Sequence, residues 1–515
     1  MRAPIAPPRS AVLAALLLAA CGDDGSGSGS ASETASGGET TGETTGGSYI
    51  GTCDPPLKGI PPESARLVVD AGGRLRDPDG RVILLRGVNT GGRSKWAPFV
   101  PFPIADDLTI PEFRAAADAF FDRLQPWGLN AVRLPFSWEA FEPTQGAYDY
   151  DYLDFYEAMV DSAWSRRLAV IVDFHQDIYA SPFCGDGFPP WTLADPDPGP
   201  PRHDCTGWGL KYFTDAGVRE AFDRFWADDD GIQSAFLEMW SQVLLAVGDK
   251  PGVIGFEIIN EPGWGTATSV DTWKSETLLP FYDAAIAELR PLAPDLLVFY
   301  DDPGVDALAG ADVEMITPAG DGLVYAPHLY DVTLLAGEAP SGVSYAGKID
   351  GMVAHREAAG HAILLGEFGI GAGAEALGGL EWIRDLMATL DDAGISATLW
   401  ECSQNEELWN EEDLSVLGPG GEERPLLDAY VRPYLRALAG DDPSFAWDPE
   451  AGVASASWVA DGGVTEIAWP LRRSPEAPSG VELSGEGACY TYDPWVGALR
   501  VQASAGAAVS LVINE

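Results

Sequence analysis

Short apolar runs alternate with longer amphipathic stretches through most of this chain. Eight runs are typical of strands, and the stretches between them carry the periodicity of helices. Continuous apolar runs suit strands that are buried on both faces. The runs are 82–88, 130–135, 168–174, 253–259, 296–300, 323–327, 362–366 and 397–400. Eight βα repeats predict an α/β fold, a TIM (β/α)8 barrel. A doubly wound sheet is the weaker interpretation, because it does not need eight strands.

The pattern changes on both sides of this repeat. In 441–515, short apolar runs are separated by Gly, Pro and Asp, which indicates a small C-terminal β-sandwich without a visible catalytic cluster. Residues 22–50 consist mainly of Gly, Ser, Thr and Glu, the composition of a flexible linker. The sequence therefore predicts a linker over 22–50, a barrel domain over 51–440 and a sandwich domain over 441–515.

The pattern of the first residues predicts a targeting segment that takes no part in the fold. Arg2 and Arg9 precede an apolar run, 11–20, that is too short to span a bilayer. The run ends at Cys21 and resembles a bacterial lipobox, which implies a lipoprotein-type signal peptide over 1–21 and an acylated Cys21 that anchors the protein to a membrane. An ordinary secretory signal is the alternative. Both place the protein outside the cytoplasm, as a membrane-anchored lipoprotein at the cell surface or in the periplasm, or as a secreted protein.

The overall composition limits the kinds of partner. The 515 residues include 17 Trp, 16 Tyr and 20 Phe, enough for a large core, and the net charge is -48. Such a negative field repels nucleic acid and anionic membrane surfaces. We therefore expect no nucleic-acid partner, and we expect the protein to be a monomer. Its membrane association would come from the anchor.

Five cysteines follow Cys21 in what is expected to be an oxidising compartment. Cys184 and Cys205 bracket one Pro- and Gly-rich loop, and we expect them to pair. Cys53 and Cys489 lie near the two ends of the folded chain and could join its two modules, which would leave Cys402 buried and free. The sequence alone leaves this second pairing open.

Two of the predicted strands end in a carboxylate. The run 253–259 is followed by Asn260-Glu261-Pro262, and the run 362–366 by Glu367. A charged group at the end of a buried strand is costly unless it has a purpose, and in a parallel barrel the carboxyl ends of the strands open onto the catalytic mouth. A strand-ending glutamate that only reaches solvent is the alternative for Glu261. Two carboxyl groups placed in this way are what glycoside hydrolysis requires.

The strand-end motifs together resemble a family 5 glycoside hydrolase and, within that family, the endoglycoceramidases and endoglycoceramidase-like glycosidases. The resemblance covers about 86–403, most of the barrel. The motifs that carry it are Asn260-Glu261-Pro262, Gly366-Glu367-Phe368-Gly369, the segment 173–179, the helical segment 225–240 and Trp400-Glu401-Cys402-Ser403. Two departures bear on the aglycone: Cys402 stands where relatives often carry an aromatic residue, and the loop 183–208 is long and rich in proline.

The resemblance implies a retaining mechanism. Glu261 would be the general acid and then the base, its pKa raised by burial and by the neighbouring carboxylate, and Glu367 would be the ionised nucleophile. Strand parity directs Arg133 into the barrel, where a guanidinium needs a carboxylate partner, so Arg133 suits Glu367. A purely structural ion pair is the alternative for Arg133, and the two roles can coexist.

The other substrate-binding candidates belong to the same strand ends. Asn260 would donate to the sugar 2-hydroxyl, and His328 and Tyr330 would orient Glu367 and contact the sugar. Trp400 would be a stacking platform for the sugar, with an ordinary core tryptophan as the alternative. The sugar side would also include Lys95, for which a solvated loop lysine is the alternative, and His175, for which a core histidine is the alternative. The full set of substrate-binding candidates is Lys95, Arg133, Asp173, His175, Asp177, Asn260, His328, Tyr330 and Trp400.

These observations predict a retaining β-glycosidase that cuts between the glycan and the ceramide of glycosphingolipids. Neither strand-end histidine has metal-ligand spacing, so we expect no metal and no cofactor. The lipid should meet an exposed apolar patch at the barrel mouth. Its expected members are Trp96, Phe99, Phe183, Phe188, Trp191 and Trp264. The alternatives are a β-glucosidase on other glycolipids such as steryl glucosides, an endo-β-glucanase, and a non-catalytic carbohydrate-binding barrel. The presence of both Glu261 and Glu367 argues against the last of these.

Overall fold

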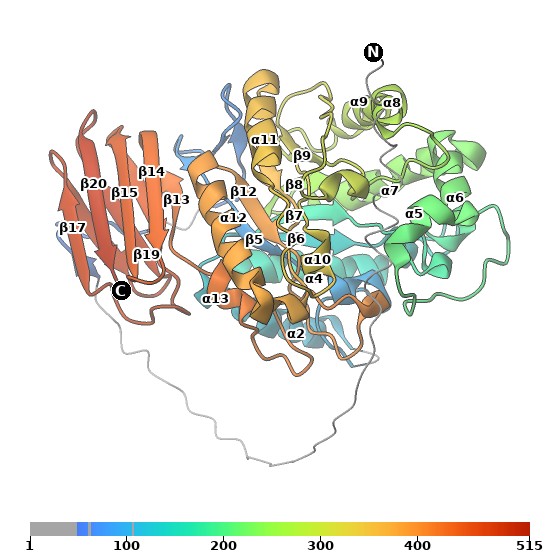
Figure 1. The fold of residues 1–515 in the computed structure, drawn as a ribbon, viewed down its shortest axis with the longest axis horizontal. Helices are drawn as coiled ribbons and strands as arrows, with labels where there is room; N and C mark the ends of the chain where they lie inside the picture. The colour runs from blue at the N-terminus through green and yellow to red at the C-terminus, as the bar shows by residue number, and fades with distance from the viewer. Residues whose placement is uncertain (1–48, 60–62, 106–107) are drawn as a thin grey trace, which may run out of the picture.

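The computed structural model describes residues 49–59, 63–105 and 108–515. Cys21 and nearly all of the predicted linker 22–50 lie outside the described residues. Eight parallel strands close into a barrel in the order β10-β11-β12-β5-β6-β7-β8-β9 (Figure 1). The barrel strands are β5 (Arg86–Asn89), β6 (Ala131–Phe136), β7 (Ala169–Phe174), β8 (Val253–Glu257), β9 (Leu297–Tyr300), β10 (Leu323–Tyr325), β11 (Ala362–Leu365) and β12 (Ser396–Leu399). The predicted TIM barrel is confirmed.

Helices alternate with the strands around the outside of the barrel. The longer ones are α2 (Ile110–Asp122), α4 (Tyr150–Ser165), α6 (Ala216–Trp226), α7 (Ile232–Val247), α9 (Leu279–Leu289), α11 (Ala346–Ala359) and α12 (Gly379–Ala393). Shorter ones are α3 (Trp138–Phe141), α5 (Lys211–Thr214), α8 (Val270–Trp273), α10 (Val332–Leu335) and α13 (Leu426–Tyr430). Local sequence sets their ends: α2 starts at a capping box in which Thr109 and Glu112 bond reciprocally. Among the described residues, no helix is both long enough and apolar enough to cross a membrane.

The sandwich has one sheet of eight strands and one of four, with the orders β1-β18-β19-β16-β13-β4-β3-β2 and β14-β15-β20-β17 (Figure 1). The strands from the start of the chain are β1 (Ile50–Gly51), β2 (Val68–Val69), β3 (Leu75–Arg76) and β4 (Val82–Ile83). The later ones are β13 (Tyr434–Leu438), β14 (Gly440–Asp448), β15 (Val453–Ala460), β16 (Val464–Ala468), β17 (Gly480–Ser484), β18 (Cys489–Asp493), β19 (Ala498–Gln502) and β20 (Ala508–Asn514).

Both ends of the chain therefore contribute to the sandwich, which corrects the expected division at residue 440. β13 precedes that boundary but pairs within the sandwich sheet, and it also pairs with β4 through Ala437 opposite Ile83. The predicted first barrel strand, 82–88, is in fact two strands, one in each domain. β1 to β4 have two residues each, too few to show an alternating pattern. A disulfide between Cys53 and Cys489 ties β1 to β18.

The barrel interior changes character along its axis. Near the amino ends of the strands, a compact apolar cluster includes Ile171, Ile254 and Leu364, and the hairpin β2–β3 adds Leu67 and Leu75 to it. Towards the carboxyl ends, the strands carry polar residues in matched register. Asn89 of β5 lies opposite Arg133 of β6, and Asp173 of β7 lies opposite Glu257 of β8. The register therefore brings charged side chains from neighbouring strands together at one end of the barrel.

Candidate active site

Arg133 lies at the centre of the charged end of the barrel and is fully buried. Its Nε and Nη2 bond both oxygens of Glu257, at 2.7 and 2.8 Å. Nη1 donates to Oε1 of Glu367 at 2.7 Å, and Nη2 also meets Oδ1 of Asp173 at 3.0 Å and donates to Asn260 at 2.8 Å. The expected pairing of Arg133 with Glu367 is present. It is part of a larger network in which one guanidinium faces three carboxyl groups.

Glu367 follows β11 and is held at both of its oxygens. Arg133 occupies Oε1, and the Tyr330 hydroxyl donates to Oε2 at 2.9 Å. Asn89 adds to this arrangement because its Oδ1 accepts from Arg133 Nη1 at 3.0 Å. Charge-assisted bonds from an arginine are short and strong, so they hold the carboxyl group in one orientation. The arrangement suits a carboxylate that must act as a nucleophile.

Glu261 stands opposite Glu367 in a different environment. Its backbone adopts φ +38°, a left-handed conformation that costs a non-glycine residue on the order of 1–3 kcal/mol. Burial, and next to it the charge of Asp177, raises the pKa of Glu261 to about 7. A carboxyl group with a pKa near neutrality can hold a proton and release it, as a general acid must.

The two carboxyl groups lie close together. One oxygen of Glu261, one ring nitrogen of His328 and one oxygen of Glu367 all lie within 4.8 Å of one another. In glycosidases, carboxyl groups about 5–5.5 Å apart leave room for a sugar carbon but not for an additional water, whereas inverting enzymes need about 6.5–9.5 Å. The close approach of Glu261 to Glu367 fits the shorter spacing.

His328 bonds a different carboxyl group from the one we expected. Its Nδ1 lies 2.8 Å from Oε1 of Glu261 and 3.5 Å from Oε2 of Glu367. Burial lowers the pKa of His328 to about 3, so the ring stays neutral. Tyr330 orients Glu367 as predicted, whereas His328 mainly orients Glu261. Both residues follow β10, and the sequence could not tell which of the two facing carboxyl groups each would reach.

Lys95 lies in the loop after β5 and is 3% exposed, so it is not a solvated loop lysine. Its Nζ contacts Asp177 at 2.7 Å and Glu412 at 3.1 Å. It also lies 4.0 Å from the ring centroid of Trp409 and 4.5 Å from that of Trp400. Burial opposes the charge, but the two carboxylates outweigh it and raise the pKa of Lys95. A fixed ammonium group of this kind is a ready donor to sugar hydroxyls.

His175 and Trp400 connect Lys95 to the central network. The ring of His175 stacks on Trp400 with centroids 4.9 Å apart and planes at 12°. Its Nδ1 bonds Asp173 at 2.9 Å, and Nε2 lies 3.5 Å from Asp177. Burial lowers the pKa of His175, but Asp173 more than compensates and the pKa rises to about 10. Trp400 is itself 2% exposed, so its expected role as a sugar platform stays a prediction.

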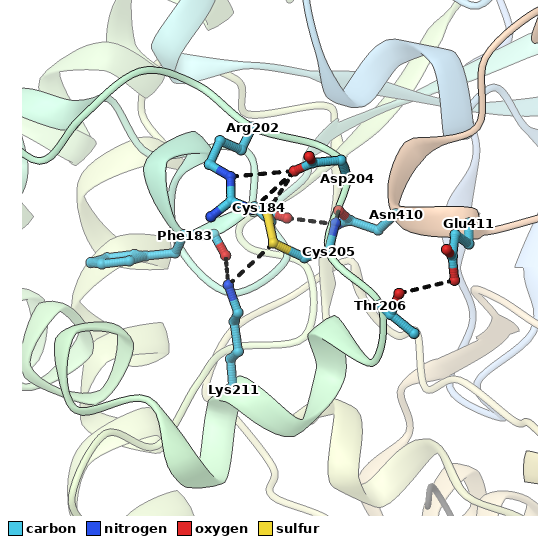
Figure 2. The surroundings of a disulfide bond; sticks show 9 residues. All are labelled: Phe183, Cys184, Arg202, Asp204, Cys205, Thr206, Lys211, Asn410 and Glu411. Atoms are coloured by element: carbon cyan, nitrogen blue, oxygen red, sulfur yellow. Dashed lines mark hydrogen bonds and ion pairs between the residues drawn. A yellow bond between two sulfur atoms is a disulfide. The ribbon is translucent and has the colours of Figure 1, made fainter. Parts of the chain in front are cut away.

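The long loop after β7 is fastened to the loop after β12. Cys184 and Cys205 form a disulfide, and the side chain of Asn410 bonds the main chain of both cysteines, as Figure 2 shows. The loop places Trp208 against Trp409, with ring centroids 4.9 Å apart. The described residues contain one free cysteine, Cys402, which is buried.

The expected apolar patch at the mouth is wrong for two of its six members. Phe188 is fully buried and stacks on Tyr179 at 4.1 Å, and Trp264 is 7% exposed and stacks on Tyr212. The four other expected members, Trp96, Phe99, Phe183 and Trp191, are half-buried. The Pro- and Gly-rich surroundings suggested exposure, but both buried rings belong to the main apolar core. Phe188 packs on rings of β7, α6 and α7, and Trp264 packs on rings of α5.

Four residues of the site were not among the expected ones. Glu257 shares Arg133, Glu412 bonds Lys95 and Trp400, Gln176 bonds the main chain of Glu261, and Asp301 bonds the Glu261 amide. The sequence offers Glu257 only as a fallback for the catalytic pair, and its bonds to Arg133 could have been expected because it has the same strand parity as Glu261. Glu412 lies in an irregular loop and gives no periodic signal.

An eight-stranded parallel barrel with two close carboxyl groups at the carboxyl ends of its strands, one beside an arginine and the other beside a neutral histidine, defines the glycoside hydrolase class of site. The family model described as Cellulase (glycosyl hydrolase family 5) matches residues 81–406. The chain therefore belongs to glycosyl hydrolase family 5, as its strand-end motifs predict.

Individual relatives narrow the comparison. An endoglycoceramidase of Cyanea nozakii is 30% identical over 259 residues, which are 46% of this chain and 46% of the relative. Endoglycoceramidase I of Rhodococcus hoagii is 31% identical over 201 residues, 38% of this chain and 37% of the relative. The chain thus matches less than half the length of these relatives. The solved structure of endo-glycoceramidase II from Rhodococcus sp. with ganglioside GM3 is similar with a TM-score of 0.69 and 25% identity, over 86% of this chain and 99% of that one.

Proposed function

We propose that this protein is a retaining β-glycosidase that cleaves glycosphingolipids between the glycan and the ceramide. The close approach of Glu261 to Glu367, with a neutral histidine on one and an arginine on the other, carries the chemical part of the proposal. The similarity to endoglycoceramidases supports the substrate class.

The reaction would proceed in two steps. In the first, a Glu367 oxygen attacks the anomeric carbon while Glu261 gives its proton to the leaving oxygen, so that ceramide departs and a glycosyl ester forms on Glu367. In the second, Glu261 takes a proton from water, whose oxygen attacks the same carbon and frees Glu367. Arg133 and Tyr330 stabilise the carboxylate that leaves. Two inversions return the sugar to its β configuration.

The side chains around Lys95 would receive the glycan. Lys95, Asp177 and His175 offer charged hydrogen-bonding groups beside Trp400, and sugars are bound by such polar groups next to aromatic rings. Asn260 lies between Arg133 and the main chain of Gln176. We expect it to contact the 2-hydroxyl at the cleavage point.

A side-by-side product assay tests the substrate class. Lactosylceramide, glucosylceramide, a steryl glucoside and soluble β-glucan are incubated with the protein, with Glu367→Gln as the inactive control. We expect intact lactose and free ceramide from lactosylceramide. Activity confined to the steryl glucoside would favour the second candidate, a steryl β-glucosidase, and activity confined to β-glucan would contradict both.

We also propose that acylated Cys21 anchors the protein to the membrane that presents its substrate. The support is the lipobox-like sequence alone. Fractionation of cells that express Cys21→Ser tests it, and the variant should move to the soluble fraction. Continued membrane association of the variant would contradict the anchor.

A further inference from the structure

One buried carboxyl group beside Glu261 has no part in the two steps above. Asp301 follows β9 directly and is 1% exposed. Its Oδ2 accepts the main-chain N–H of Glu261 at 3.1 Å. The same oxygen lies 3.4 Å from Nε2 of His328. Asp301 thus contacts both the main chain of Glu261 and the imidazole that holds the Glu261 side chain.

The main-chain contact has a specific reason at Glu261. A glutamate at φ +38° is not held there by its own preference, so the surrounding residues must hold it. Asp301 bonds the N–H of this residue, and Gln176 donates from Nε2 to its carbonyl oxygen at 2.8 Å. The two bonds fix the peptide groups on both sides of the Glu261 Cα and so set the direction of its side chain.

The imidazole contact reaches the other end of the same side chain. His328 bonds Oε1 of Glu261 through Nδ1 at 2.8 Å and turns Nε2 towards Asp301. The hydrogen bond made by one ring nitrogen of a histidine sets the role of the other. The Asp301 carboxyl group is 3.4 Å from Nε2, and a hydrogen bond across this short gap would fix the ring orientation and the nitrogen that faces Glu261.

The loop that begins at Asp301 also closes around Glu261. A Cβ on Gly304 would lie 2.2 Å from Oε2 of Glu261, so only glycine leaves room for the carboxyl group there. Asp301 itself is fixed, because Oδ1 accepts the N–H of Asp302 at 2.7 Å and the Tyr282 hydroxyl donates to its carbonyl oxygen at 2.8 Å. The loop therefore contacts Glu261 at two points, through Asp301 at its main-chain amide and through Gly304 beside its carboxyl group.

We propose that Asp301 is a positioning residue for the acid/base Glu261, acting through the Glu261 amide and through His328. The inference rests on the proposed function, because it assigns proton transfer to Glu261. If this is correct, loss of the Asp301 carboxyl group lowers kcat/KM for substrates whose leaving group needs a proton. It changes kcat/KM little for substrates whose leaving group does not. A residue that only stabilises the fold would not make this distinction.

The test compares two lactosides whose leaving groups differ in this need. Dinitrophenolate departs without a proton, whereas an alkoxide requires one, and kcat/KM reports the step in which the leaving group departs. For Asp301→Asn we expect kcat/KM on an alkyl β-lactoside to fall roughly 10- to 100-fold, part of the roughly 10²–10⁴-fold that a general acid contributes. On dinitrophenyl β-lactoside we expect less than about a threefold fall.

Asp302→Asn is the matched control. Asp302 is the next residue and is also buried, but its partners are Lys274 and Tyr325 rather than Glu261 or His328. Its ratio of the two kcat/KM values should equal that of the wild type. If Asp301→Asn does not fold, Asp301→Ser replaces it and should show the same selective loss.

The results distinguish a failure of the positioning role of Asp301 from a failure of the proposed function. Equal losses on both lactosides, or no loss on either, would overturn the positioning role of Asp301. Glu261→Gln is the reference and should show the selective loss in its strongest form. If Glu261→Gln shows no selectivity, or if the wild type cleaves neither lactoside, the proposed function fails and the role of Asp301 fails with it.

Discussion

The two ends of the barrel are built from the same eight strands and have opposite chemistry. Away from the mouth, Ile171, Ile254 and Leu364 belong to a buried apolar cluster to which the hairpin β2–β3 contributes Leu75. At the carboxyl ends, Arg133 is surrounded by Glu257, Asp173 and Glu367. The apolar cluster at the amino ends stabilises the fold by burying apolar surface. This stabilisation offsets the free-energy cost of burying the charged cluster at the carboxyl ends.

Each end of the barrel contains a buried arginine paired with carboxylates, so the two arginines can be compared directly. Arg86, at the start of β5, pairs with Asp391 at 2.6 Å and donates to the carbonyl oxygen of Ile395 at 2.7 Å. Arg133 is as deeply buried, but its partners include Glu367. The cost of burying a guanidinium is met at both ends by carboxylates. At the mouth, Glu367 also faces a second carboxyl group, that of Glu261, whereas Asp391 pairs with a second arginine, Arg432.

The largest expected effect is the loss of either carboxyl group at the mouth. Glu367→Gln should lower kcat/KM by roughly 10⁴-fold or more, and Glu261→Gln by about 10²–10⁴-fold on substrates that need a proton. Both variants keep the shape of the side chain, so circular dichroism and the melting temperature should change little. Mass spectrometry with a 2-fluoro glycoside should locate the trapped sugar on Glu367 of the wild type. Near-normal activity of either variant would place the catalytic pair elsewhere.

Removal of the two arginines should separate activity from stability. Arg133→Leu leaves three carboxyl groups without their cation, so unfolding free energy should fall by about 3–5 kcal/mol and kcat by roughly 10²–10³-fold. Arg86→Leu should cause a similar loss of stability but leave kcat of the folded protein unchanged. Denaturant titration and initial rates measure the two quantities. A comparable loss of kcat in Arg86→Leu would contradict the claim that only the arginine at the mouth affects catalysis.

A cavity in the apolar cluster should affect stability alone. Leu364→Ala removes a fully buried side chain of β11 and should cost about 2–5 kcal/mol of unfolding free energy. Glu367 comes later in the chain and is held by Arg133 and Tyr330, so kcat per folded molecule should stay within about twofold of the wild type. Urea titration with active-site counting checks this. A selective fall in kcat would mean that packing in the apolar cluster controls the geometry of the mouth.

The smallest predicted effect concerns a carboxyl group near the mouth without a cation partner. Glu139 of α3 accepts a hydrogen bond from Ser181 at 2.7 Å, and burial raises its pKa to about 7. The folded state therefore holds the proton more tightly than the unfolded state. Its contribution to stability is complete below about pH 4.5 and is lost as the pH rises to about 7, with a slope of at most about 1.4 kcal/mol per pH unit. Glu139→Gln should flatten the stability curve in this window. An unchanged curve would contradict the raised pKa.

Much of the barrel could be predicted from the sequence because its signals are local. Continuous apolar runs ending in polar residues identify the strands, and parallel closure brings those ends together, so Glu261, Glu367, Arg133 and Asp173 could be placed in one site before any coordinates. The sandwich boundary could not, because β1 to β4 have two residues each, and β1 and β4 join the sandwich by pairing with strands that lie hundreds of residues away.

Individual side-chain contacts could not be predicted from the sequence either. His328 can reach either carboxyl group, and only the three-dimensional arrangement shows that Glu261 is the nearer one. The rings of Phe188 and Trp264 were expected on the surface, but both are buried in the main apolar core. Asp301 carries no motif of its own, since its importance depends on the conformation of Glu261.

The measurement that tests the central claim most directly is the configuration of the first product. Lactosylceramide is mixed with enough enzyme for rapid turnover, and proton NMR follows the anomeric signals before mutarotation. A nucleophilic Glu367 opposite an acid Glu261 predicts that β-lactose appears first, together with free ceramide. If α-lactose appears first, the two carboxyl groups do not act as nucleophile and acid/base. If glucosylceramide and galactose appear, the bond that is cut is not the one to ceramide.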